Sequence, residues 1–301
     1  MKVLIMGGKG QLGQLVARGF ARDGQEVIST DLPELDITRQ EAVDQAMHNT
    51  RPALVVNCSA YTAVDRAETD TEIAFAVNRD GPAHLAAACD AHGIPLIHIS
   101  TDYVFDGNLG KPYRETDPVC PVGVYAASKA EGEVAVRTAA GRHIILRTAW
   151  LYAARGKNFV HTMLAAADRG VSLRVVADQR GCPTAAGDLA AAVVEISRQV
   201  ASSQAAASPR WGTYHYCGSG ITTWYDFAVA IFASVRRWGK EMNPAIAPVT
   251  TREYPTPARR PPFSALDCTA LEKAFGIVPP PWQESLDGVI DQIMTEWKAK
   301  G

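Results

Sequence analysis

Two residues spaced for proton transfer stand out in this chain of 301 residues. Tyr125 and Lys129 lie four positions apart, in the run Tyr125-Ala-Ala-Ser-Lys129, at the start of a predicted helix. Residues i and i+4 share a helix face, so we expect the phenol and the ammonium to lie side by side. The positive charge would favour the phenolate and lower the pKa of the tyrosine. The pair therefore predicts proton exchange with a carbonyl or alcohol oxygen.

A glycine-rich loop near the N-terminus gives a second chemical signal. The run Gly7-Gly8-Lys9-Gly10-Gln11-Leu12-Gly13 fits both the GxxGxxG and the GxGxxG pattern. Between a predicted strand and a predicted helix, such a loop lets the backbone approach a pyrophosphate, and the helix N-terminus offers free N–H groups. The loop predicts a bound dinucleotide.

The identity of that dinucleotide stays open between NADH and NADPH. Asp31 ends the second predicted strand, where an acid binds the ribose hydroxyls of NAD. A turn or helix-capping aspartate is the alternative. Lys9 favours the other cofactor, because its ammonium suits the 2′-phosphate of NADP.

Polar residues also end the fourth predicted strand, in the run Ser100-Thr101-Asp102. In a doubly wound sheet, ligands bind beyond the carboxyl ends of the strands. We therefore expect a hydroxyl from Thr101, or from Ser100, to bind the substrate oxygen beside Tyr125.

The elements that position these residues alternate along the first half of the chain. Continuously apolar strands separated by helical patterns are typical of a parallel sheet covered on both faces. The fold class is therefore α/β, with a Rossmann-type doubly wound parallel sheet. We expect strands at 3–6, 26–30, 53–57, 94–100 and 143–147, and helices at 11–22, 40–49, 71–91 and 123–140.

Beyond Trp150 the pattern loosens and predicts a smaller, mostly C-terminal lobe for substrate binding. The small, polar stretch 201–209 is expected to be an exposed linker. We assign 1–155 to an NAD(P)-binding Rossmann domain, with 171–217 returning to it, and 156–170 with 218–301 to the substrate-binding lobe. Further helices are expected at 158–168, 187–199, 223–237, 267–275 and 283–298, and strands at 172–176 and 212–216.

Composition restricts the partners. A net charge of -2 gives no argument for nucleic acid or a membrane surface as a partner. No apolar run approaches the roughly 20 residues of a membrane helix, and the apolar N-terminal run is too short for a signal peptide. The six cysteines show neither CxxC pairs nor zinc spacing, which suits free thiols in a reducing compartment. We expect a cytoplasmic enzyme without a metal.

Longer motifs follow one another along the whole chain. Together they resemble the extended short-chain dehydrogenase/reductases and, more narrowly, the dTDP-4-dehydrorhamnose reductase family. The motifs are Asn57–Ala60, Tyr61–Asp65, Ser100–Phe105, Tyr125–Lys129, Arg147–Tyr152, Asn158-Phe159, Asp178-Gln179, Pro183-Thr184, Thr222–Trp224 and Tyr254–Pro261.

The resemblance implies hydride transfer from NAD(P)H to the C4 ketone of dTDP-4-dehydro-β-L-rhamnose, the last step of dTDP-L-rhamnose synthesis. It implies that Tyr125 protonates the forming alkoxide, that Lys129 assists and that Thr101 holds the oxygen. The substrate contacts would be Thr101, Asp102, Trp150 and Arg260, the last because a guanidinium grips phosphate. The cofactor contacts would be Gly7, Gly10, Gln11, Leu12, Gly13, Asp31, Asp36, Ile37, Ala60, Tyr61, Thr62, Ile99, Tyr125 and Lys129.

Two other functions remain open at this point. A non-catalytic regulatory subunit, like that of methionine adenosyltransferase, would share the fold, but the complete set of Thr101, Tyr125 and Lys129 favours catalysis. A nucleotide-sugar dehydratase or epimerase would share it too, but such a dehydratase needs an extra acid/base pair, and Asp102 is followed by Tyr103. At single positions, core packing for Trp150, an N-cap for Asp36 and a solvated surface for Arg260 are the alternatives.

One departure from the family concerns a metal. Some members dimerise through a magnesium ion held by surface glutamates. The positions that align with two of them are Leu15 and Gly187, which offer no carboxylate to a hard cation. We therefore predict no such bridge and a monomer, with a homodimer as the alternative.

Overall fold

A parallel sheet of six strands forms the centre of the computed structural model, which describes residues 1–202, 210–239 and 242–299. The strand order is β10-β5-β4-β3-β1-β2. The chain adds β2 on one side of β1 and then β3, β4 and β5 on the other, so the topological switch point lies between β1 and β3. A ligand crevice is expected there, at the carboxyl ends of the strands. The strands are β1 (Lys2–Met6), β2 (Glu26–Thr30), β3 (Leu54–Asn57), β4 (Leu96–Thr101), β5 (His143–Thr148) and β10 (Gly212–His215). The predicted α/β class is confirmed.

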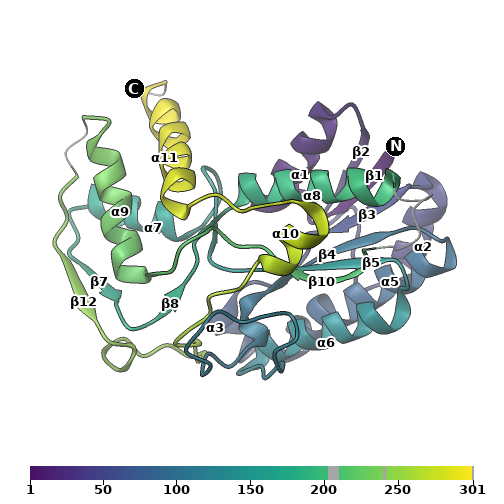
Figure 1. Cartoon of the computed structure of the whole chain (residues 1–301), viewed down its shortest axis with the longest axis horizontal. Helices are drawn as coiled ribbons and strands as arrows, with labels where there is room; N and C mark the ends of the chain where they lie inside the picture. The colour runs from purple at the N-terminus through teal and green to yellow at the C-terminus, as the bar shows by residue number, and fades with distance from the viewer. Residues whose placement is uncertain (203–209, 240–241, 300–301) are drawn as a thin grey trace.

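Helices cover both faces of this sheet (Figure 1). On one face, α1 turns Leu12, Val16 and Phe20 towards the strands, at the spacing of one helix face. A second apolar core fills the opposite face. The first face carries α1 (Gln11–Arg22), α8 (Ala186–Ser202) and α10 (Thr269–Phe275), and the second α2 (Gln40–Thr50), α5 (Gly81–Ala91) and α6 (Val124–Ala139).

A further core lies beside the sheet, at the left of Figure 1. Phe227, Trp282 and Ile290 are among its buried side chains. It is built by α7 (Phe159–Asp168), α9 (Trp224–Arg236), α11 (Trp282–Lys298) and the parallel pair β7 (Leu173–Val176) and β12 (Ile246–Val249). Short elements connect the cores: α3 (Val64–Ala67), the 3-10 helices η2 (Asp102–Val104) and η4 (Thr251–Glu253), and strands β6 (Leu151–Tyr152), β8 (Arg180–Gly181), β9 (Thr184–Ala185) and β11 (Thr222–Thr223).

The chain passes between these cores more than once. After β7, α8 and β10 return to the sheet, whereas α9 and α11 belong to the further core. The domain boundaries stated above stay a prediction. Of the predicted linker, the first two residues end α8, and 203–209 lie outside the described residues. Across the described ranges, we find no helix long and apolar enough to cross a membrane.

The helix expected at 71–91 has an unexpected middle. It consists of α4 (Thr71–Phe75), a π-helical segment η1 (Ala76–Asp80) and α5. The Asn78 amide exchanges two hydrogen bonds with the Tyr61 backbone and a third with the Ser128 hydroxyl. A Cβ on Gly132 of α6 would lie 2.0 Å from the Asn78 carbonyl oxygen. The wider turn thus brings the π segment against both the loop after β3 and α6.

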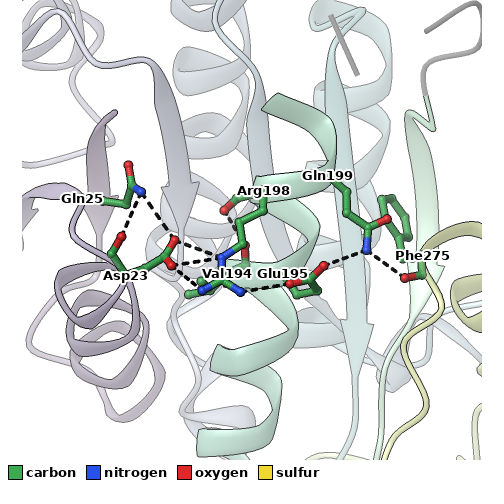
Figure 2. A network of polar contacts seen from close by, with 8 residues as sticks. Asp23, Gln25, Val194, Glu195, Arg198, Gln199 and Phe275 are labelled. Atoms are coloured by element: carbon green, nitrogen blue, oxygen red, sulfur yellow. Dashed lines mark hydrogen bonds and ion pairs between the residues drawn. The ribbon is translucent and has the colours of Figure 1, made fainter. Parts of the chain in front are cut away.

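Polar contacts fasten α8 to its neighbours (Figure 2). Arg198 forms an ion pair with Asp23, which caps the end of α1, and another with Glu195. The amide of Gln199 donates to the backbone oxygen of Phe275, the last residue of α10. Because such exposed pairs contribute little each, the apolar core beneath holds most of this face together.

Candidate active site

A cavity of about 1010 Å³ opens at the carboxyl ends of the strands, between the sheet and the further core. It brings the glycine-rich loop, the end of β4, the first turns of α6 and one side of α11 around one space. The predicted site residues that line it are Gly10, Gln11, Leu12, Gly13, Ala60, Thr62, Ile99, Thr101, Asp102, Tyr125, Lys129 and Trp150.

The glycine-rich loop has room for backbone only. A Cβ on Gly7 would lie 2.7 Å from the Ser59 nitrogen, and one on Gly13 would lie 2.1 Å from the Gly7 oxygen. Gly10 precedes α1 without a side chain to cap the helix, which leaves the first N–H groups of α1 to an anion. The loop therefore fits the pyrophosphate of a dinucleotide.

The predicted ribose end of this groove carries both signs of charge. The Asp31 carboxylate accepts hydrogen bonds from the backbone nitrogens of Lys9 and Leu32. The Lys9 ammonium forms an exposed ion pair with Glu34 at 2.7 Å. A ribose hydroxyl would meet Asp31, whereas a 2′-phosphate would compete with Glu34 for Lys9.

Tyr125 and Lys129 are both buried in the first two turns of α6. The Lys129 ammonium donates a hydrogen bond of 2.8 Å to the Ile99 oxygen. Burial lowers the pKa of Lys129 to about 8. Contrary to the expectation from the pair alone, burial raises the pKa of Tyr125 to about 12, although a hydrogen bond with Thr101 acts in the opposite direction. The Tyr125 phenol is thus protonated at neutral pH.

Thr101 and Asp102 lie opposite Tyr125, where β4 passes into η2. The Thr101 hydroxyl donates to Asp102 at 3.0 Å and accepts the Tyr103 N–H. Burial raises the pKa of Asp102 to about 6. Ser100, the alternative to Thr101, donates instead to a buried glutamate of α6, so of these two hydroxyls that of Thr101 is the one that interacts with Tyr125.

Trp150 follows β5 with a left-handed φ of 47°. Its ring stacks on Trp224, with centroids 3.6 Å apart, and lies over Gly181, where a Cβ would come within 2.5 Å. The unusual backbone conformation turns the indole into the space between the cores, where it lines the cavity.

The other predicted site residues lie away from the cavity wall. Arg260 forms an ion pair of 2.8 Å with Asp65. Asp36 accepts two hydrogen bonds from Thr38, as a capping residue does. Ile37 is buried against Gly81, and the Tyr61 hydroxyl donates to Asp70. Their binding roles, like those of Gly7 and Asp31, stay predictions.

Residues not expected from the sequence also shape the site. The Asn158 amide donates to Gln11 at 2.7 Å, which joins the start of α7 to the glycine-rich loop. Thr148, at the end of β5, lines the cavity, and within the described structure its buried hydroxyl has no hydrogen-bond partner. A polar residue ending an apolar strand is the signal that identified Thr101, and it applies equally to Thr148.

Comparisons with known proteins agree with this arrangement. The family model described as RmlD substrate binding domain matches residues 1–295. A dTDP-4-dehydrorhamnose reductase of Sinorhizobium fredii is 42% identical over 299 residues, which are 99% of this chain and 99% of that protein.

Solved structures extend the similarity. A crystal structure of a dTDP-4-dehydrorhamnose reductase from Clostridium acetobutylicum has a TM-score of 0.91 and 40% identity, covering 98% of this chain and 100% of that one. That of the Bacillus anthracis dTDP-4-dehydrorhamnose reductase in complex with NADP has a TM-score of 0.88 and 33% identity, covering 97% and 99%. With a family model and relatives that match over nearly the full length, the chain belongs to the RmlD substrate binding domain family, that of the dTDP-4-dehydrorhamnose reductases.

Proposed function

We propose that this protein reduces the C4 ketone of dTDP-4-dehydro-β-L-rhamnose to dTDP-β-L-rhamnose, the last step of dTDP-L-rhamnose synthesis, with NADPH or NADH as the reductant. The observation that carries the proposal is a single cavity that holds a proton donor, a hydroxyl and a loop fitted to a dinucleotide. The names of full-length relatives support the substrate.

In this proposal the chain supplies the proton and the orientation. When bound, the reduced nicotinamide supplies a hydride to the carbonyl carbon. Tyr125 donates its phenolic proton to the carbonyl oxygen, since its raised pKa keeps it protonated at neutral pH. The Thr101 hydroxyl turns its single proton from Asp102 to the same oxygen when substrate binds, and the Lys129 ammonium stabilises the phenolate that forms.

The sugar nucleotide would lie between the sheet and the further core. Asp102 and Trp150 line that side of the cavity. The Asp102 carboxyl group would accept hydrogen bonds from sugar hydroxyls, and the Trp150 indole would cover an apolar face of the sugar. Arg260 would reach the diphosphate only by leaving its ion pair with Asp65, so its part depends on a rearrangement when the substrate binds.

The cytoplasm remains the proposed location, supported by six free cysteines. A monomer without a magnesium bridge remains the proposed state, because Leu15 and Gly187 offer no carboxylate. Mass from light scattering, measured with and without EDTA, checks this state. A dimer that the chelator dissociates would contradict it.

The direct experiment supplies dTDP-4-dehydro-L-rhamnose with NADH or NADPH and follows the loss of reduced-cofactor absorbance and the sugar product. We expect oxidation of at least one cofactor with equal formation of dTDP-L-rhamnose. If neither cofactor is oxidised while both bind, the protein is no reductase of this substrate, and a binding role in the same fold would take its place.

A further inference from the structure

A buried ion pair lies one helical turn beyond Lys129. Glu133, on the same face of α6, is fully buried, and Arg147 of β5 is 2% exposed. The guanidinium reaches both carboxylate oxygens of Glu133, at 2.8 and 2.7 Å. Two parallel hydrogen bonds of this kind fix the orientation of both side chains.

The pair is also connected to the end of β4. The Ser100 hydroxyl donates to Glu133 at 2.6 Å, one residue before Thr101. Arg147 lies under the Phe105 ring, 5.0 Å from its centroid, and within 3.4 Å of the His215 imidazole. Glu133 therefore ties the helix that carries Tyr125 to the strand that carries Thr101.

The titratable groups around Lys129 come from several elements. On α6 they are Tyr125 and Glu133, and Glu133 favours the Lys129 ammonium. From β4, His98 faces Lys129 and is kept neutral, because burial and the ammonium lower its pKa. From the end of β3 comes Cys58, whose pKa burial raises to about 12. Glu133 is thus the anion among these neighbours.

We propose that Glu133, held by Arg147 and Ser100, is a positioning residue of this active site: its carboxylate keeps the Lys129 ammonium charged and fixes the first turns of α6 on the end of β4. The inference rests on the proposed reductase function and assigns a role that the reaction itself leaves open.

Stability alone gives a weak reason for such a pair. Burying two ions costs desolvation that their attraction scarcely repays, and well-packed apolar residues often serve as well. A charge placed one turn from a buried ammonium acts differently, because it opposes the burial that lowers the pKa of Lys129.

The test is the pH dependence of kcat for Glu133→Gln. The limb of interest is the part of the pH–rate profile in which kcat drops with rising pH, as Lys129 loses its proton. Without the Glu133 carboxylate the pKa of Lys129 falls, so this limb moves to lower pH. At an effective dielectric constant near 20, a unit charge one turn away is worth roughly two pK units, so we expect a shift of about one to two. Glu131→Gln is the matched control, because Glu131 is an exposed residue of the same helix, and its limb should not move.

A surface variant tests the opposite sign without disturbing the buried pair. Arg137, whose side chain is 37% exposed, donates to Glu133 at 3.0 Å. Arg137→Gln removes a positive neighbour of the carboxylate, so the limb should move to higher pH, by a few tenths of a unit because solvent screens the charge. Glu133→Asp keeps the negative charge, so its limb should lie much closer to the wild-type position than that of Glu133→Gln.

A measurement without turnover separates this inference from the proposed function. The Lys129 amine is titrated by NMR on lysine labelled with carbon-13 in the full chain, its signal assigned with Lys129→Met. If the wild type reduces no ketone, the proposed function fails, and this titration still reports the effect of Glu133. If Glu133→Gln folds and leaves both the limb and the Lys129 titration where the Glu131→Gln control has them, the inference is overturned.

Discussion

The chemistry of Tyr125 depends on where its proton is held. Chiefly through burial, the pKa of this phenol is raised to about 12, so the residue suits donation to a forming alkoxide better than abstraction. The reverse reaction needs a phenolate, and there the Lys129 ammonium has to offset the burial. The protonation state of Tyr125 thus decides which direction of the reaction this side chain can assist.

Replacing Tyr125 with Phe removes the proton donor and keeps the ring. We expect kcat to fall by about 10²- to 10⁴-fold, while the Kd of the reduced cofactor, measured by fluorescence, stays close to that of the wild type. Tyr214→Phe, which removes a hydroxyl from the edge strand β10, is the control. Near-normal turnover in Tyr125→Phe would exclude the donor role.

Cofactor preference is expected to respond to Glu34. In Glu34→Gln the Lys9 ammonium loses its ion pair and a negative charge leaves the ribose end, so a 2′-phosphate is bound more readily. Because an exposed ion pair is a weak interaction, KM for NADPH should fall by no more than about fivefold. KM for NADH should not change, nor should either value in Glu41→Gln, an exposed residue of α2. Equal changes for both cofactors would contradict this role.

The candidate site was predictable where a residue ends a strand or begins a helix. Thr101, Tyr125 and the glycine-rich loop were found in this way and line one cavity, apart from Gly7 and Gly8. Glu133 was not, because nothing in a helical pattern says which partner a buried carboxylate has. Arg147 gave a usable signal, since an arginine within an apolar strand needs an anion.

At the scale of elements, the backbones of the π segment and α6 approach each other so closely that a glycine is needed where they meet. Gly132 permits it, because any Cβ there meets the Asn78 carbonyl. The same contact carries Ser128, between Tyr125 and Lys129, to the Asn78 amide. The π turn therefore sets the distance of the catalytic helix from the loop after β3.

Gly132→Ala is expected to destabilise the fold by about 1–3 kcal/mol, the usual cost of overpacking, in spite of the better helix propensity of alanine. Urea denaturation followed by circular dichroism measures it. Gly288→Ala in α11 is the matched control: no atom lies within 4 Å of its added Cβ, so it should be neutral or stabilise by up to about 1 kcal/mol. A neutral Gly132→Ala would show that the helices separate easily.

Periodicity predicted the helices and strands well, because their apolar faces are set by local spacing. It gave α1 and β2 with the bounds that the structure has. It missed the π segment within 71–91, since one extra residue in a turn leaves an alanine-rich apolar pattern almost unchanged. It also missed the left-handed Trp150, a conformation imposed by Trp224 and Gly181 from distant parts of the chain.

At the scale of the whole molecule, two buried histidines make stability depend on pH. Burial lowers the pKa of His215 to about 3 and that of His98 well below its usual value. The unfolded chain binds these protons below about pH 6.5 and the folded chain does not, so stability is present above that pH and is lost as pH falls. This loss of stability continues until the pH reaches the pKa values that the two histidines have in the folded chain.

Urea denaturation should therefore show a free energy of unfolding that falls between pH 6.5 and pH 5, by about 2 kcal/mol for His215 and further for His98. In His215→Asn we expect a lower stability at neutral pH but a flatter dependence on pH. His48→Asn, on the exposed surface of α2, should keep the wild-type slope. An unchanged slope in His215→Asn would assign the acid sensitivity to other groups.

The place of α11 has a consequence for biosynthesis. This helix supplies one wall of the cavity through Glu284, Gly288 and Val289, whereas the glycine-rich loop is made much earlier than α11. Domains form from the N-terminus as the ribosome elongates the chain. A nascent chain thus holds its glycine-rich loop long before it has a closed cavity, and the cavity can close only after α11 has left the ribosome.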